Sequence, residues 1–193
     1  MFRLLRCALT AAFAALALAG IAQAKGGNYV FDGGTPKEQA EVRSALNASA
    51  FNWSLVPAQV TVHIAPGLGT SDATPGELWL DSALLDSGVF SWGIVQHEYA
   101  HEVDFFLLDE GKRAALAPQL GGQSWFPGAG APLAHGQLTC ERFASTLAWA
   151  YWPSARNSMK PQSRNDESSA MAPAAFRALL AQVLAVPVAA LRG

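Results

Sequence analysis

The segment from residue 90 to 108 (FSWGIVQHEYAHEVDFFLL) constrains the fold more than any other part of the chain. In a helix with about 100° per residue, four titratable side chains fall on one arc: His97, Glu98, His101 and Asp104. Most of the remaining circumference is apolar, and only Gln96 and Glu102 interrupt it. A helix that is apolar nearly all round is typical of a buried element. We therefore expect this helix to be central, with a polar site on one side.

The polar side of this helix carries the pattern H-E-Y-A-H at residues 97–101. Residues four apart on a helix stand one turn above each other, so the imidazoles of His97 and His101 can bind one Zn²⁺. Glu98 falls on the same side, where it can act as the general base that takes a proton from water. The pattern thus predicts a Zn²⁺ site. The alternative is a cluster of buried polar groups that only hydrogen-bond to one another.

A catalytic zinc site needs a third protein ligand besides the two histidines. The longer motif, with a third histidine six residues after His101, is absent. Glu141 is the best candidate, because the same face of its predicted helix carries small residues that permit close approach: Ala144, Ser145 and Ala148. His135, in a glycine-rich loop, is an alternative ligand. Glu141 could instead be a surface carboxylate that pairs with Arg142.

The motifs H-E-Y-A-H-E-V-D at 97–104 and E-R-F-A at 141–144 together resemble the gluzincin metallopeptidases. They are most similar to the type of Mlc titration factor A and anthrax lethal factor, and the resemblance covers about residues 90–152. It implies that Glu98 is the general base and that the zinc ligands are His97, His101 and Glu141. It also implies that Asp104 orients a ligand imidazole from outside the coordination sphere.

The same resemblance implies the zincin arrangement, in which the edge strand of a small sheet binds extended peptide beside the active-site helix. The predicted strand at 77–81 fits that place by its order in the chain. Gluzincins also use a Tyr or His to stabilise the oxyanion, for which Tyr99, Tyr151 and His135 are candidates. The helical positions of both tyrosines lie away from the metal face, so we expect them to pack in the core and favour His135.

The rest of the chain predicts a single α+β domain over residues 25–193, and the resemblance implies that this is a minimal zincin-like domain with a small mixed sheet on the H-E-x-x-H helix. Thr35 to Glu38 has the pattern of a capping box and begins a helix to about residue 47. Alternating apolar and polar residues predict strands at 59–64 and 77–81, the second as an edge strand. Further helices are expected at 110–118, 138–152 and 172–185. Loops are expected at 121–137 and 153–168. Trp125 lies in the first of these loops, where it could line a cleft, and Cys140 is expected to be a buried, inert thiol.

Residues 1–24 have the pattern of a secretory signal peptide. Arg3 and Arg6 precede an uncharged apolar stretch, and Ala22-Gln23-Ala24 offers a cleavage site after Ala24. A retained membrane anchor is the alternative, but the uncharged stretch is barely long enough to span a bilayer. We therefore expect a secreted or cell-envelope protein with no stable membrane span after cleavage.

Charge and cysteine content exclude other classes of protein. Thirteen Lys and Arg against 15 Asp and Glu give a net charge of −2, so a basic nucleic-acid binder is excluded. Cys140 alone would remain after cleavage of the signal peptide, so the domain must be held by its core or by a metal rather than by a disulfide.

Together these features predict an exported zinc metallopeptidase that acts on a peptide or protein substrate. Two other functions stay open. One is a zincin-like binding module whose metal is structural or non-catalytic, which would have four protein ligands, such as His135 in addition to the other three. The other is an exported scaffold or inhibitor without metal.

Overall fold

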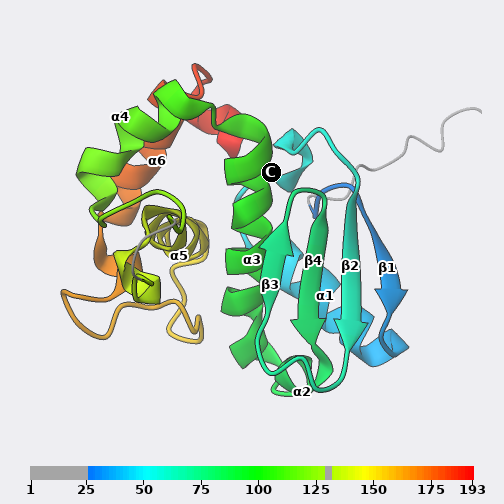
Figure 1. The fold of residues 1–193 in the computed structure, drawn as a ribbon. Helices are drawn as coiled ribbons and strands as arrows, with labels where there is room; N and C mark the ends of the chain where they lie inside the picture. Colours follow the sequence, from blue (N-terminus) through cyan, green and yellow to red (C-terminus); the bar gives the residue numbers. More distant parts are fainter. Residues whose placement is uncertain (1–25, 129–131) are drawn as a thin grey trace, which may run out of the picture.

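A computed structural model describes residues 26–128 and 132–193, and the structural statements below concern these residues. The predicted signal peptide lies outside them. The described part of the chain is an α+β fold with one mixed four-stranded sheet and six α-helices, as the sequence predicts (Figure 1). Within it, no helix combines the length and hydropathy that a bilayer crossing would need.

The sheet has the strand order β1-β2-β4-β3, with β1 (Tyr29–Gly33), β2 (Val60–Ala65) and β4 (Glu77–Asp81) parallel to one another. The short β3 (Asp72–Thr74) runs antiparallel to β4. Alternation along β2 and β4 buries one face against the core: Val60, Val62, Ile64, Leu78 and Leu80.

The predicted strands at 59–64 and 77–81 are thus present, whereas β1 and β3 were not predicted. The prediction of residues 77–81 as an edge strand is wrong, because β4 lies between β2 and β3. The chain turns back through Gly76, which has a φ of 86°, so that the three residues before the turn form the edge. Three residues are too few for alternation to be recognised in the sequence.

The six helices in the described residues are α1 (Pro36–Ala48), α2 (Ser82–Leu85), α3 (Val89–Leu107), α4 (Glu110–Leu120), α5 (Thr139–Tyr151) and α6 (Pro173–Val183). Five of them lie close to their predicted positions, whereas the short α2 was not predicted. The capping box of α1 is confirmed: the Glu38 backbone N–H donates to the Thr35 hydroxyl, and the Thr35 N–H donates to the Glu38 carboxylate. Two short 3₁₀ helices lie in the first predicted loop and at the end of the second: η2 (His135–Gln137) and η3 (Glu167–Ser169).

Helix α3 is the central element, with the sheet and α1 on one side and α4, α5 and α6 on the other (Figure 1). Every residue from Val95 to Asp104 is buried, as the apolar circumference of this segment predicts. The interrupting Gln96 is accommodated because its side-chain amide donates to the Ala45 carbonyl at 2.7 Å. The position of α3 places its polar arc at the junction between the two halves of the fold.

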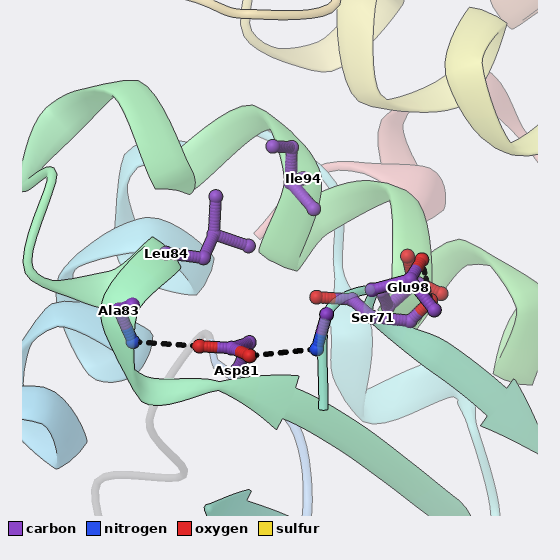
Figure 2. Close-up of a pocket in the computed structure, with 8 residues that line it drawn as sticks. Ser71, Asp81, Ala83, Leu84, Ile94 and Glu98 are labelled. Atoms are coloured by element: carbon purple, nitrogen blue, oxygen red, sulfur yellow. Dashed lines mark hydrogen bonds between the residues drawn. The ribbon is translucent and has the colours of Figure 1, made fainter. Parts of the chain in front are cut away.

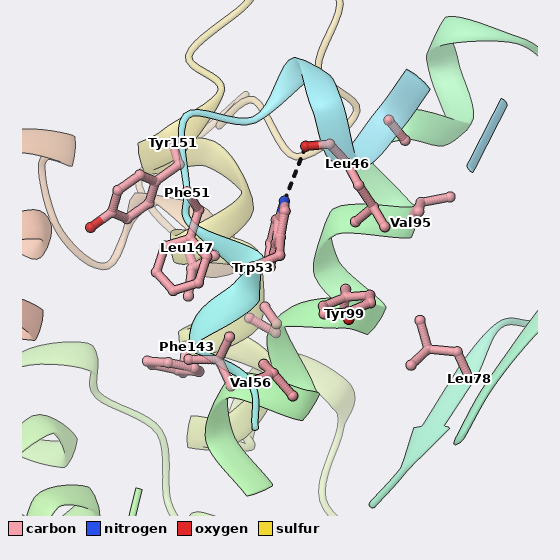
Figure 3. Close-up of a cluster of buried hydrophobic side chains, with 14 of the residues drawn as sticks. Leu46, Phe51, Trp53, Val56, Leu78, Val95, Tyr99, Phe143, Leu147 and Tyr151 are labelled. Carbon is pink, nitrogen blue, oxygen red and sulfur yellow. Dashed lines mark hydrogen bonds between the residues drawn. The ribbon is translucent and has the colours of Figure 1, made fainter. Parts of the chain in front are cut away.

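Aromatic side chains fill the core around α3 (Figure 3). Trp53 packs edge-on against Phe51 and Tyr99, with ring centroids 4.8 and 5.2 Å apart, and Tyr151 packs against Phe51. The Trp53 indole N–H donates to the Leu46 carbonyl at 3.1 Å. Tyr99 and Tyr151 are fully or almost fully buried in this cluster, as expected of packing residues.

Candidate metal centre

The two histidines and the glutamate of the H-E-x-x-H pattern lie together in the middle of α3. Each of His97, Glu98 and His101 is at most 7 % exposed. One ligand atom from each lies within 4.8 Å of the others, and the two Nε2 atoms of the histidines are 3.3 Å apart. The one-turn spacing of the motif thus brings both imidazoles to one point, as the sequence predicts.

Glu141 reaches the same point from the first turn of α5. Its Oε2 lies 3.1 Å from Nε2 of His97 and 3.3 Å from Nε2 of His101. Ala144 and Ala148 on this helix are completely buried, in accord with the close approach to α3 that their small size permits. The N-terminal end of a helix also stabilises a carboxylate through the helix dipole.

His135 joins the cluster from η2, in the glycine- and proline-rich segment before α5. Its Nε2 lies 3.0 Å from the same Oε2 of Glu141, and its ring is stacked on that of His97 with a centroid distance of 5.9 Å. The side chain is 63 % exposed, far more than those of the other two histidines. The structure therefore brings together all of the metal-ligating candidates, including the alternative one.

A further carboxylate lies behind the histidines, and it was not predicted. Glu167 in η3 accepts from Nδ1 of His135 at 2.7 Å and from the Ser145 hydroxyl at 2.9 Å. Ser145 in turn lies 3.0 Å from Nδ1 of His97. Residues 153–168 carry no pattern that distinguishes Glu167 from other polar loop residues, so only the folded chain could reveal its place.

Asp104 does not make the contact that the family resemblance implies. Its carboxylate accepts from Nε of Arg113 and from the indole N–H of Trp125, both at 2.8 Å, and within the described residues it has no hydrogen bond to an imidazole. Asp104 lies three residues after His101 on the same arc of α3, but its carboxylate faces Arg113 of α4 and Trp125 of the loop before α5 instead. Trp125, which the sequence suggests could line a cleft, is half-buried and lines a pocket of about 310 Å³ against α4, and its indole N–H anchors this loop to α3.

The carboxyl groups at the site experience opposite environments. Burial raises the pKa of Glu98 above its usual range, although the neighbouring His97 and His101 oppose the shift. Burial would also raise the pKa of Glu141, but its hydrogen bonds with the three histidines outweigh this effect and hold the pKa well below its usual range. These surroundings favour the charged form of Glu141 and the protonated form of Glu98.

The hydrogen-bond directions indicate whether these residues fit a cation. A carboxylate can only accept, so the Ser145 hydroxyl donates to Glu167 and must accept from the Nδ1–H of His97. If the His97 ring is protonated, its Nε2–H donates to Oε2 of Glu141; in the neutral ring, Nε2 instead carries a lone pair that faces this oxygen. His135 lies between two carboxylates, and its hydrogen bonds to Glu141 through Nε2 and to Glu167 through Nδ1 raise its pKa to about 10, so without a metal the ring carries both protons. A bound cation would stabilise the neutral rings, in which these acceptors converge.

The spacing and chemistry of these atoms suit zinc. The four measured separations among the Nε2 atoms and Oε2 of Glu141 are 3.0, 3.1, 3.3 and 3.3 Å. Ligands in a zinc tetrahedron with bonds of about 2.0–2.1 Å are ~3.3 Å apart. Imidazole nitrogen and carboxylate oxygen are both common zinc ligands. The residues present therefore fit a zinc ion.

A pocket of about 480 Å³ opens beside Glu98 (Figure 2). Leu84 and Ile94 provide its apolar wall, and Asp81 and Ser71 lie on the other side. The Asp81 carboxylate accepts from the backbone N–H groups of Gly69 and Ala83, each at 2.8 Å. These hydrogen bonds hold the loop before β3 and the start of α2 in place, and both segments line the pocket.

Comparison of the chain with models of known protein families, with curated proteins and with solved structures finds no significant match.

Proposed function

We propose that this protein is an exported, zinc-dependent metallopeptidase of the gluzincin type. His97, His101 and Glu141 would hold the zinc ion, and Glu98 would be the general base. One observation carries the proposal: three nitrogen and oxygen donors from two buried helices converge on one point, beside a buried carboxyl group whose pKa is raised.

Zinc, when bound there, would polarise a water molecule and the carbonyl of the peptide bond. Glu98 would accept a proton from the water and deliver it to the leaving amine. Its raised pKa suits this exchange, because a general base works best when its pKa approaches the working pH. Burial of Glu98 also keeps bulk water from competing for the proton.

The substrate would be an extended peptide that lies along the edge of the sheet, next to the pocket. β3 is an edge strand packed against α3, and a peptide could pair with its backbone. One substrate side chain would enter the pocket formed by Ile94 and Leu84 next to Glu98. The role that the family resemblance implies for the edge strand thus falls to β3 rather than to β4.

The proposal is tested by incubating the zinc-loaded protein with a complex peptide mixture and identifying new termini by mass spectrometry. We expect cleavage that a chelator abolishes and that zinc restores. His101→Ala should abolish cleavage, whereas His63→Ala, on the sheet and paired with Asp32, should not. Cleavage that persists unchanged in chelator or in His101→Ala would contradict the proposal.

One observation favours a second function, a binding module with a non-catalytic metal. His135 lies as close to Glu141 as the other histidines do, so it could complete a closed site with four protein ligands. In that case zinc would bind, no peptide would be cleaved, and His135→Ala would expose an open position. If His135 instead stabilises the oxyanion, His135→Ala should lower peptide cleavage while zinc stays bound.

A further inference from the structure

We propose that Glu167 is a positioning residue of the metal centre, which orients His97 through Ser145 and His135 directly. This inference rests on the proposed zinc site and adds a residue to it. The two oxygens of the one carboxylate serve different histidines: Oε2 accepts from Ser145 and Oε1 accepts from His135. A single side chain thus links the buried ligand of α3 to the exposed histidine of η2.

The relay through Ser145 depends on burial. Ser145 is 2 % exposed, so bulk water cannot replace the hydrogen bonds of its hydroxyl. Because the hydroxyl donates to Glu167, it accepts from Nδ1 of His97 and leaves Nε2 of that ring free to bind a cation. Without Glu167, the hydroxyl could turn and donate to Nδ1, which would place the proton of His97 on the wrong nitrogen.

Glu167 is itself held in place by α5. Its carbonyl accepts from the Thr146 hydroxyl at 3.3 Å and from the Ala170 N–H at 3.2 Å. Thr146 is fully buried and follows Ser145 directly in the chain, so the same helical turn holds both the backbone and the carboxylate of Glu167. Gly136 leaves room for this approach, since a Cβ there would lie 3.3 Å from Oε1 of Glu167.

The first test measures zinc affinity by competition with a chromophoric chelator. Glu167→Gln keeps the shape of the side chain, but its amide presents a donor where a second acceptor is needed. We expect zinc affinity to fall about 10- to 100-fold, the usual effect of losing a partner that orients a metal ligand. Glu110→Gln, on the exposed first turn of α4, is the matched control and should leave the affinity unchanged. Equal affinities of Glu167→Gln and the wild type would overturn the inference.

A double-mutant cycle tests whether Ser145 and Glu167 act in one relay. Ser145→Ala alone should weaken zinc binding, and adding Glu167→Gln should cost less than Glu167→Gln does in the wild type. Fully additive losses would contradict the relay. If Glu167→Gln fails to fold, Ser145→Ala alone decides, because unchanged zinc affinity in that variant would equally exclude the relay.

Nitrogen-15 NMR of the histidine rings reports which ring nitrogen carries the proton, and a purely structural role of Glu167 would leave this unchanged. In the zinc-loaded wild type, we expect a proton on Nδ1 of His97 and on Nδ1 of His135. In Glu167→Gln the Nδ1 signal of His135 should shift or broaden, while that of His63 stays unchanged. An unchanged His135 signal would overturn the assignment.

The zinc affinity of His101→Ala separates failure of this inference from failure of the proposed function. If His101→Ala binds zinc as tightly as the wild type, the proposed metal centre is wrong. If His101→Ala loses zinc but Glu167→Gln keeps it, the metal centre stands and only the role of Glu167 is wrong.

Discussion

At the scale of single residues, Glu98 and Glu141 show how position determines the chemistry of a carboxyl group. Both lie beside His97 and His101, but Glu141 has three imidazole partners, whereas the pKa of Glu98 is dominated by burial. The pKa of Glu98 is therefore raised and that of Glu141 lowered. Such opposite pKa shifts are typical of sites where one carboxylate stays ionised and another transfers a proton.

This contrast predicts the behaviour of Glu98→Gln. The variant should keep zinc affinity close to that of the wild type, because Glu98 is not among the three proposed ligands. Peptide hydrolysis should fall by about 10²- to 10⁴-fold, the usual contribution of a general base. Parallel measurements of zinc content and peptide cleavage check this, and hydrolysis at the wild-type rate would show that Glu98 is not the base.

Glu102 is a buried carboxyl group that the proposed chemistry does not use. Its Oε2 accepts from the Gly76 N–H at 2.9 Å, whereas Oε1 has no partner within the described residues. Burial raises its pKa to about 7, and the hydrogen bond from Gly76 only partly offsets this effect. The unfolded chain loses the Glu102 proton near its ordinary pKa of 4.5, before the folded chain does.

The raised pKa of Glu102 predicts that it favours folding fully below about pH 4.5 and that this contribution is lost as pH rises through about 7. The loss is up to roughly 3 kcal/mol at pH 8. Glu102→Gln, which cannot ionise, should therefore increase stability relative to the wild type more at pH 8 than at pH 5. Denaturant unfolding of the metal-free protein measures this, and an equal effect at both pH values would contradict the assignment.

At the scale of elements, Asp104 connects α3 to two neighbours. The ion pair with Arg113 fixes α4, and the hydrogen bond from Trp125 fixes the loop that leads to His135 and α5. Asp104 is completely buried and Arg113 is partly exposed, so the pair is only partly screened by water. The residue is thus a link between elements rather than a partner of the imidazoles.

Asp104→Asn should therefore lower the free energy of unfolding more than it lowers zinc affinity. We expect a loss of about 1–3 kcal/mol from the weakened charged hydrogen bonds. Zinc affinity of the folded variant should stay near the wild-type value. Denaturant unfolding and chelator competition on the same sample distinguish the two effects, and a large drop in zinc affinity without a loss of stability would restore the role implied by the resemblance.

Gly93 shows why α3 can lie so close to the loop after α5. A Cβ at this position would stand 2.2 Å from Oδ1 of Asn157 and 3.0 Å from the backbone N of Ser158. Asn157 is buried and bound to the end of α5 through the Ala148 and Trp152 carbonyls, so it has little room to move.

Gly93→Ala should therefore destabilise the fold by about 1–3 kcal/mol through overpacking, although alanine favours helix formation. Gly111→Ala is the matched control, because it lies on the exposed face of α4 with only a distant contact at 3.4 Å. It should stabilise the protein by about 0.5–1 kcal/mol. Thermal unfolding of both variants checks this, and equal shifts would contradict the close packing at Gly93.

The five longer helices and the strands β2 and β4 could be recognised from sequence because their patterns repeat over several residues. The capping box at Thr35 and the buried circumference of α3 are local signals of this kind. β3 was missed because its pairing depends on a turn. Glu167 was missed because its contacts with Ser145 and His135 depend on a chain reversal after α5. Contacts between distant segments leave no periodic trace in the segments themselves.

At the scale of the whole molecule, the candidate site lies where two halves of the fold meet. α3 supplies His97, Glu98 and His101; the helical half supplies Glu141, His135 and Glu167; and the sheet half supplies β3 and much of the pocket wall. α3 packs against both halves, so the position of the candidate ligand atoms depends on the folding of both. A metal bound there would also link the halves and stabilise the fold.

If His97, His101 and Glu141 form one zinc site, metal analysis of the purified protein should find the ion. After zinc loading and removal of free metal, the wild type and His63→Ala should retain about one zinc ion per chain, and His101→Ala should retain almost none. A wild type that retains no zinc, or a His101→Ala variant that retains as much as the wild type, would contradict the account.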